Sequence, residues 1–190
     1  MSYALTFYKG SLDAIAGNFR TPTTQFYESL LPAWKRLYAG LPGEDTEATL
    51  MEALRTIFSS FDKSPEAGPL SVEAAIASGV MSQATELGSL AHSSAGGDLF
   101  RDEFLGVVAA EIVGEPRLTE YLTRRPLFGF RPKDYPGWGY LTTAELEKRA
   151  ASPRPAPKIT DSDLRAWLKD FEPMLEEVRN SQKDLLTVYR

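Results

Sequence analysis

Few residues of this chain combine the types and the spacing that catalysis requires. The 190 residues include one histidine and no cysteine, which excludes thiol nucleophiles, disulfides and cysteine-ligated metal sites. His92 lies in "AHSSAGGD", two residues before Ser94. In a serine hydrolase the catalytic base follows the nucleophile at a long interval, so this pair does not fit that mechanism. We therefore interpret His92 as a loop residue or as a capping partner.

Paired carboxylates are the other common catalytic device, and the closest pairs are Asp102 with Glu103 and Asp161 with Asp163. We expect the first pair on a solvated helix face and the second at a helix N-terminus, capped by Asp161. Neither pair has the spacing of a Ca²⁺-binding loop, and the Walker and dinucleotide-binding motifs are absent. The sequence thus predicts no catalytic residues, no metal and no cofactor, and it favours a binding protein over an enzyme.

The stretch "YPGWGYLTTAEL", residues 135 to 146, allows two interpretations. Thr142 and Glu145 have the spacing of a capping box, which predicts a short strand followed by a helix. In the first interpretation the stretch is a structural corner, in which Trp138 packs under the preceding loop. In the second it contributes to a binding site, because Arg131, Tyr135 and Trp138 are of the types enriched at interaction hot spots.

Charge and hydropathy exclude several classes of partner. The chain has 21 basic and 26 acidic residues, a net charge of −5, so we expect no nucleic acid partner. Its longest apolar run, "VVAAEIV", is far shorter than the roughly 20 residues that span a bilayer, so we expect no membrane partner. The N-terminus lacks the features of a signal peptide, and we expect a cytoplasmic protein.

The leading functional hypothesis is that this acidic, motif-poor protein binds another protein, as a bacterial immunity or antitoxin-like protein does. Clusters of acidic residues on predicted helices and turns would steer a basic partner toward it. The clusters comprise Glu44, Asp45 and Glu47, and also Glu172, Glu176 and Glu177.

The alternative hypothesis is a small-molecule binding protein or an enzyme with a pocket under the 115–139 loop. In that pocket Arg124, Arg125 and Arg131 would anchor an anion. Trp138 would form a wall on which the ligand stacks.

The elements that would position these residues follow from hydrophobic periodicity, which predicts one mainly helical α+β domain over 1–190. "YALTFY" alternates and "DLLTVYR" is rich in β-branched and aromatic residues, so we expect strands at 3–8 and 184–189. A third strand is expected at 138–141. Isolated strands must pair to satisfy their backbone groups, so the N-terminal and C-terminal strands are expected as neighbours in a small, helix-covered sheet.

Helices account for most of the remaining chain. We place them at 11–17, 21–40, 46–61, 71–78, 98–114, 143–150 and from 160 or 161 to beyond 178. Phe58 and Val107 fall on the apolar stripes of their helices, and Asp98 is expected to cap the helix that follows it. The segment 79–97 is rich in Gly, Ser and Ala and is expected to be part loop and part weak helix. We expect an irregular loop at 115–137 and a proline-rich connector at 152–157.

Three of these stretches carry a resemblance to a known family. The N-terminal "SYALTFY", the motif "GWGYLTTAEL" and the terminal "DLLTVYR" resemble a group of bacterial proteins related to the YfbM-like domain of unknown function. The resemblance covers the two ends and the motif, and leaves about 40 to 115 unmatched. It implies a single α+β domain and a bacterial source, and it implies no catalytic residues.

Overall fold

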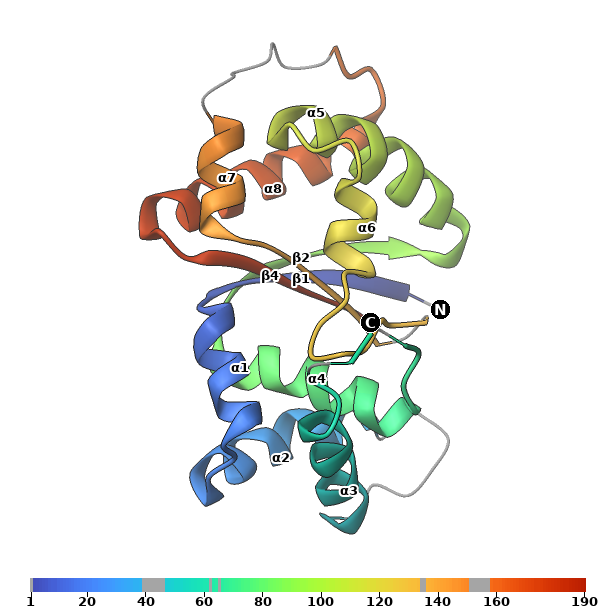
Figure 1. Ribbon diagram of the computed structural model, residues 1–190. Coiled ribbons are helices and arrows are strands. Elements are labelled where there is room, and N and C mark those ends of the chain that lie inside the picture. The colour runs from blue at the N-terminus through green and yellow to red at the C-terminus, as the bar shows by residue number, and fades with distance from the viewer. Residues whose placement is uncertain (1, 39–46, 62, 65, 134–135, 151–157) are drawn as a thin grey trace.

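A four-stranded antiparallel sheet divides the helices into two layers in a computed structural model of the chain (Figure 1). The structure describes residues 2–38, 47–61, 63–64, 66–133, 136–150 and 158–190. The strands are β1 (Ser2–Gly10), β2 (Thr85–Ser93), β3 (Gly137–Leu141) and β4 (Asp184–Tyr189), in the order β2-β1-β4-β3. The predicted α+β fold is confirmed, as is the pairing of the N-terminal strand with the C-terminal one.

Strand β2 corrects the expectation of loop and weak helix over 79–97. The preceding helix runs on to Gln83, and Thr85–Ser93 then pairs with almost the whole of β1. The segment has few β-branched residues, and only Leu90 and His92 are buried within it. Its strand conformation therefore comes from pairing along β1 and from burial of one face, which override a weak local preference.

The lower layer in Figure 1 contains α1 (Leu12–Arg20), α2 (Thr24–Tyr38), α3 (Glu47–Phe58) and α4 (Leu70–Gln83). Helix α4 lies at the centre of this layer, and every residue from Val72 to Val80 in it is buried. Its contacts include the sheet residues Leu186, Val188 and Trp138, which belong to the same apolar cluster. Phe58 does not belong to this cluster, because it is 60% exposed, so the predicted apolar stripe of α3 is wrong at this position.

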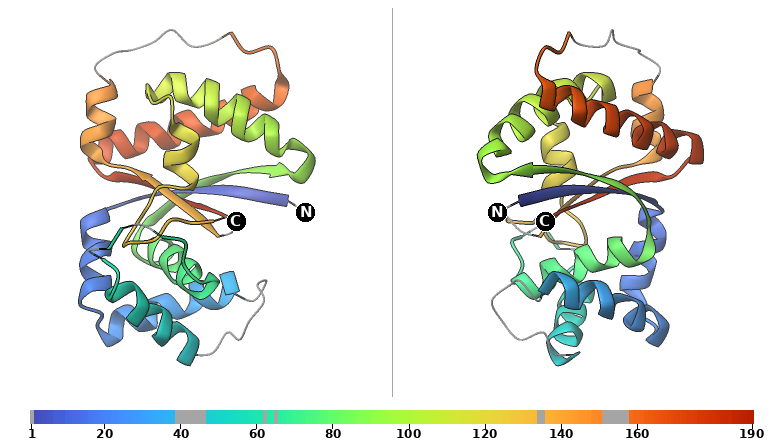
Figure 2. Two further views of the ribbon diagram at one scale, coloured as in Figure 1. Left: turned by 45° about the vertical axis from the view of Figure 1, so that its right-hand side comes forward. Right: turned by 180° about the vertical axis from the view of Figure 1, so that it is seen from behind.

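The upper layer covers the opposite face of the sheet (Figure 2). A π-type helix, η2 (Leu99–Ala109), continues into α5 (Ala110–Val113), followed by α6 (Leu118–Thr123), α7 (Thr143–Ala150) and α8 (Ser162–Ser181). Helix α6 lies within 115–137, where we expected only irregular loop. The predicted connector at 152–157 lies outside the described residues. No helix in the described ranges is both long and apolar enough to cross a bilayer.

Two capping predictions have different outcomes. The Asp161 carboxylate accepts hydrogen bonds from the backbone N–H groups of Asp163 and Leu164, as expected. Asp98 makes no capping hydrogen bond with its side chain and instead accepts from Arg101 at 2.8 Å.

Gly139 allows α6 to pack directly on β3. A Cβ atom at this position would lie 2.2 Å from the Tyr121 carbonyl oxygen and 2.3 Å from the Leu122 carbonyl carbon. Such distances are far below van der Waals contact, so only glycine permits this approach. The close packing fixes the C-terminal end of α6, which Arg124 follows directly.

Candidate functional site

Arg125, one of the expected anion anchors, is held by Glu145 of α7. Its Nη1 and Nη2 atoms donate to the two Glu145 carboxylate oxygens at 2.8 and 2.9 Å. Nη1 also donates to the Tyr140 carbonyl at 3.0 Å, and the guanidinium stacks over the Tyr121 and Tyr140 rings. Both terminal nitrogens are thus engaged within the protein, so Arg125 fastens β3, α6 and α7 together instead of facing a ligand.

The Glu145 carboxylate also completes the predicted capping box. It accepts from the Thr142 backbone N–H at 2.8 Å and from the Thr142 hydroxyl at 2.9 Å, and the Glu145 N–H donates back to that hydroxyl at 3.3 Å. Burial alone would raise the pKa of Glu145, but the hydrogen bonds from Arg125 and Thr142 outweigh it and lower the pKa to about 2. Burial likewise opposes the charge of Arg125, while the hydrogen bonds to Glu145 raise its pKa overall.

Trp138 is fully buried in the lower apolar cluster, so it does not form the wall of a ligand pocket. Leu127, Phe128 and Phe130 from the preceding loop belong to the same cluster. The structural interpretation of "YPGWGYLTTAEL" therefore describes this tryptophan correctly. Tyr135, which we also expected to contribute to binding, lies outside the described residues.

Arg124 and Arg131, the other two expected anchors, line one cleft of about 650 Å³. Lys133 and Arg101 add two further cations to its lining, which also includes Tyr189 at the end of β4. Sequence reasoning missed these three residues, although the alternation of basic residues in "RPK" (131–133) was a usable signal for Lys133. Its described lining thus holds four cations against the two carboxylates of Asp102 and Glu120, in a protein whose net charge is −5.

The segment that carries Arg131 and Lys133 is anchored at three points. Leu127 and Phe130 exchange both backbone hydrogen bonds across a tight turn, in which Phe128 and Gly129 have φ angles of 55° and 80°. The Arg131 N–H donates to the Glu66 carbonyl at 2.9 Å, and the Lys133 N–H donates to the buried Glu73 carboxylate at 3.1 Å. These contacts fix the backbone and leave the two basic side chains exposed on the cleft.

His92 lies on β2, not in a loop, and is 6% exposed. Its Nδ1 lies 2.9 Å from the Ser93 carbonyl oxygen, and its Nε2 lies 2.8 Å from the Tyr189 hydroxyl. A carbonyl oxygen only accepts, so the contact with Ser93 favours the tautomer with hydrogen on Nδ1, in which Nε2 accepts the hydrogen of Tyr189. The Phe100 ring stacks on the His92 ring with the two centroids 4.6 Å apart, so Phe100 helps to bury His92.

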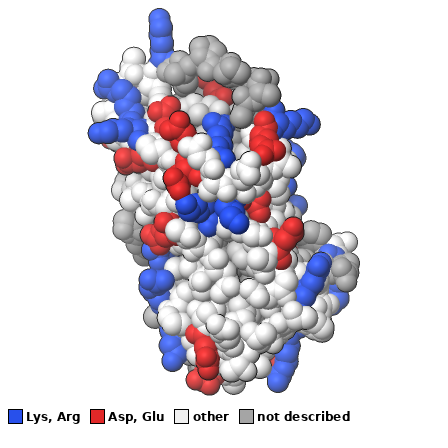
Figure 3. Space-filling model, turned by 90° about the vertical axis from the view of Figure 1, so that its left-hand side faces the viewer, with Lys and Arg blue, Asp and Glu red and all other residues white. Residues whose placement is uncertain are grey.

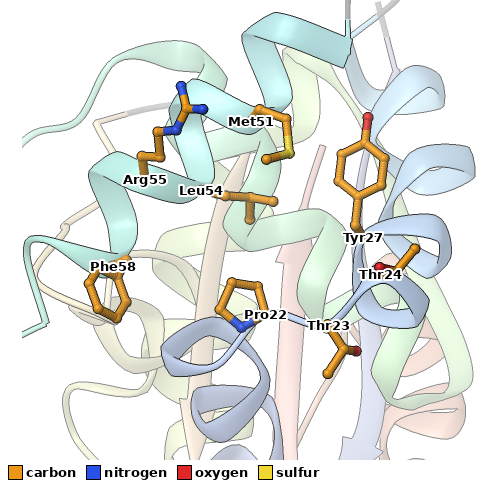
Figure 4. A pocket seen from close by; sticks show the side chains of 8 residues that line it. All are labelled: Pro22, Thr23, Thr24, Tyr27, Met51, Leu54, Arg55 and Phe58. Carbon is orange, nitrogen blue, oxygen red and sulfur yellow. The ribbon is translucent and has the colours of Figure 1, made fainter.

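A second surface feature is an apolar groove between α3 and the start of α2, which we name the α2–α3 groove (Figure 4). Its volume is about 540 Å³. The described residues that line it are Pro22, Thr23, Thr24, Tyr27, Met51, Leu54, Arg55 and Phe58. Leu54 is buried at its base, whereas Met51 and Phe58 are 40% and 60% exposed.

The apolar residues of α3 spread over more of its circumference than one buried face requires. Leu50, Leu54 and Ile57 are buried against the core, and Met51 and Phe58 lie beside them on the solvent side. This width was the signal that the sequence prediction missed when it placed Phe58 on one apolar stripe with Leu50, Leu54 and Ile57. Val107 of η2, also expected in the core, is 46% exposed.

The acidic clusters expected to steer a basic partner are only partly described. Glu44 and Asp45 lie outside the described residues, and Glu47 is exposed in the first turn of α3. On α8, Glu172 and Glu176 are exposed, and Glu177 forms an ion pair with Lys9. Lys9 therefore interrupts the acidic surface along α8.

Neither the cleft nor the groove has the donor set of a metal site, and the described part of the chain holds no group of three His, Asp or Glu side chains suited to bind a metal ion. No protein-family model matches the chain, and neither a curated protein nor a solved structure does. The resemblance to the YfbM-like domain therefore stays a prediction.

Proposed function

We propose that the protein binds another protein, and that the α2–α3 groove receives an amphipathic helix of that partner. The observation that carries this proposal is the exposure of Met51 and Phe58 on one apolar depression. Among the described residues, Val107 is the one other large apolar side chain that is comparably exposed to solvent. Contiguous apolar surface of this kind is typical of interaction sites.

The spacing of the exposed residues favours a helical partner. Met51 and Phe58 are seven positions apart on one helix, which separates them by two turns or about 10.5 Å. A partner helix with apolar residues at positions i, i+3 or i+4 and i+7 covers the same length. Tyr27 and Pro22 face α3 across the groove and supply its second wall (Figure 4).

The described lining of the groove carries little charge, as the centre of a protein interface usually does. Among the described residues of that lining, Arg55 is the one with a charge, and its ion pair with Glu52 is long, at 3.4 Å, and exposed. At the edge of the groove, Glu47 lies beside Tyr27. Beside the groove, Asn18, Gln83 and Ser29 form a chain of hydrogen bonds between amides and a hydroxyl. Figure 3 shows an uncharged area in the lower, helical half of the molecule, on the side where α1 lies.

The class of partner that we favour is a toxin domain, which would make the protein an immunity or antitoxin-like protein. The exposed Glu172 and Glu176 lie on α8, in the other helical layer from the groove, and suit a partner that also carries basic surface. This identity rests on charge alone and is separate from the proposal that the groove binds a helix.

The test is affinity capture from a native lysate of the producing cells, with the wild-type protein and two variants. The double variant Met51→Asp, Phe58→Asp places charges in the groove, and truncation of central anchors typically weakens an interface by at least about 2 kcal/mol, or roughly 30-fold. Val107→Asp is the control, because it introduces one aspartate at an exposed apolar residue that does not line the groove.

We expect a stoichiometric partner to be retained by the wild type and by Val107→Asp and lost by the groove variant. All three proteins should unfold at similar temperatures, because exposed substitutions usually change stability by less than about 0.5 kcal/mol. A lysate that yields no stoichiometric partner would count against the proposal. Equal capture by the groove variant would show that the partner binds elsewhere.

A further inference from the structure

The cleft lined by Arg124, Arg131 and Lys133, away from the α2–α3 groove, has the composition of a site for a small anionic ligand. None of these three side chains forms a hydrogen bond or an ion pair with another residue in the described part of the chain. Arg101 is different, because it donates to Asp98 at 2.8 Å. The three cations outnumber the two carboxylates of the cleft, Asp102 and Glu120, so an anion placed among the cations would reduce their mutual repulsion.

Arginine in such a position favours an oxyanion. The guanidinium group presents donors in a fixed fork that matches the geometry of phosphate or carboxylate, and lysine adds a compact point charge. Arg124 follows α6, which is fixed by its packing on Gly139, whereas Arg131 and Lys133 follow the pinned turn at 127–130. The cations therefore come from rigid backbone on two sides of the cleft, which reduces the ordering cost of binding.

The other polar residues of the cleft indicate what the rest of the ligand carries. The carboxylates of Asp102 and Glu120 line the same cavity and only accept hydrogen bonds. Tyr189 also lines it, and in the His92 tautomer with hydrogen on Nδ1 its hydroxyl hydrogen is directed to Nε2 of that ring. The Tyr189 oxygen is thus a further acceptor. Acceptors beside cations match a ligand that has both an anionic group and hydroxyl donors.

The volume of about 650 Å³ has room for such a ligand, since small-molecule sites usually measure roughly 300 to 1,000 Å³. The polar lining argues against an apolar ligand, and an isolated phosphate would leave the acceptors unused. We propose that this cleft is a binding site for a phosphorylated polyol of the sugar phosphate class, with Arg124, Arg131 and Lys133 on the phosphate and Asp102, Glu120 and Tyr189 on the hydroxyls.

The test is isothermal titration calorimetry with four probes at one ionic strength: glucose 6-phosphate, glycerol 3-phosphate, inorganic phosphate and glucose. Constant ionic strength matters because salt screens exposed charges. We expect saturable binding of at least one phosphorylated polyol, affinity for inorganic phosphate at least tenfold lower, and no measurable binding of glucose.

Three variants assign the contacts. Arg124→Gln combined with Arg131→Gln should lower the affinity for phosphate and for the sugar phosphate at least tenfold. Arg165→Gln, an exposed arginine on α8 that lines neither the cleft nor the α2–α3 groove, is the matched control and should change neither affinity. Tyr189→Phe keeps the ring and removes the acceptor, so it should lower affinity for the sugar phosphate and spare inorganic phosphate.

Three results would overturn the proposal. They are the absence of saturable binding for both phosphorylated polyols, equal affinity for the polyol phosphates and for inorganic phosphate, and unchanged affinity in the double arginine variant. None of them bears on the α2–α3 groove, which is tested by capture of a protein. Failure of one proposal is therefore distinguishable from failure of the other.

Discussion

The Arg125–Glu145 ion pair allows a quantitative test of how the "YPGWGYLTTAEL" corner is stabilised. The perturbation is Glu145→Gln, which keeps the size of the side chain and removes the charge that faces Arg125. One Arg125 hydrogen bond and both Thr142 hydrogen bonds depend on the carboxylate oxygen Oε2. The substitution should therefore weaken a network that joins β3 to α7.

The expected magnitude follows from the pKa of Glu145, which the folded structure lowers from 4.5 to about 2. A pKa difference of about 2.5 between the unfolded and folded states corresponds to about 3 kcal/mol of folding free energy at any pH well above 4.5, the unfolded-state pKa. The Glu145 side chain is 26% exposed, and solvent screening reduces this contribution, so we expect a loss of about 2 kcal/mol at pH 7. For a domain of this size, that loss lowers the unfolding temperature by about 4 to 8 °C.

The sign of the pH dependence is a second prediction from the same pair. The folded-state pKa is depressed, so the stabilisation is fully present above about pH 5 and is lost as the pH falls from 4.5 toward 2. The difference in unfolding free energy between the wild type and Glu145→Gln should therefore shrink over that range. Urea unfolding at pH 7, 5, 4 and 3 measures it.

Glu52→Gln is the matched control for this measurement. Glu52 pairs with Arg55 at 3.4 Å, and both side chains are more than 70% exposed, so the loss should stay below about 0.5 kcal/mol. Equal losses in the two variants would refute the argument that burial and geometry give the Arg125 pair its strength. A wild-type advantage that is unchanged between pH 7 and pH 3 would refute the assigned pKa shift.

Two further substitutions, Gly139→Ala and Trp138→Ala, probe the packing of β3, and Gly17→Ala is the control for the first. Gly139→Ala should destabilise the protein by about 3 kcal/mol or more in thermal unfolding, because the added Cβ overlaps the backbone of α6. Gly17→Ala in α1 should instead be stabilising by about 0.5 to 1 kcal/mol, because a Cβ added there would meet no neighbouring element within 4 Å. A comparable loss of stability in both variants would contradict the packing argument. Trp138→Ala should cost about 3 to 5 kcal/mol in urea unfolding and leave the affinity of the folded protein for sugar phosphate unchanged, since Trp138 does not line the cleft.

The sequence by itself determined the features that depend on residues close together in the chain. The alternation in "YALTFY" and the composition of "DLLTVYR" identified β1 and β4, and the need of isolated strands for a partner predicted their pairing. The spacing of Thr142 and Glu145 predicted the capping box and the start of α7. These interactions act within a few residues or follow from an obligatory backbone requirement, so a sequence pattern suffices to find them.

Tertiary structure decided which side of each element faces the core. Arg124 and Arg125 are adjacent and chemically alike, yet one lines the cleft and the other is enclosed by Glu145, Tyr121 and Tyr140. Strand β2 likewise owes its conformation to β1, a partner more than 70 positions away in the chain. No local pattern carries this information, because it depends on the order of the strands.

The composition of the two candidate sites was decided in the same way. Arg101, Arg124 and Lys133 reach one cleft from η2, from the end of α6 and from the segment after the 127–130 turn. The periodicity of α3 showed that it is amphipathic, but its packing angle on the core determined that Phe58 stays on the solvent side. A sequence specifies the residues available for a site, and the packing of distant segments determines which of them meet.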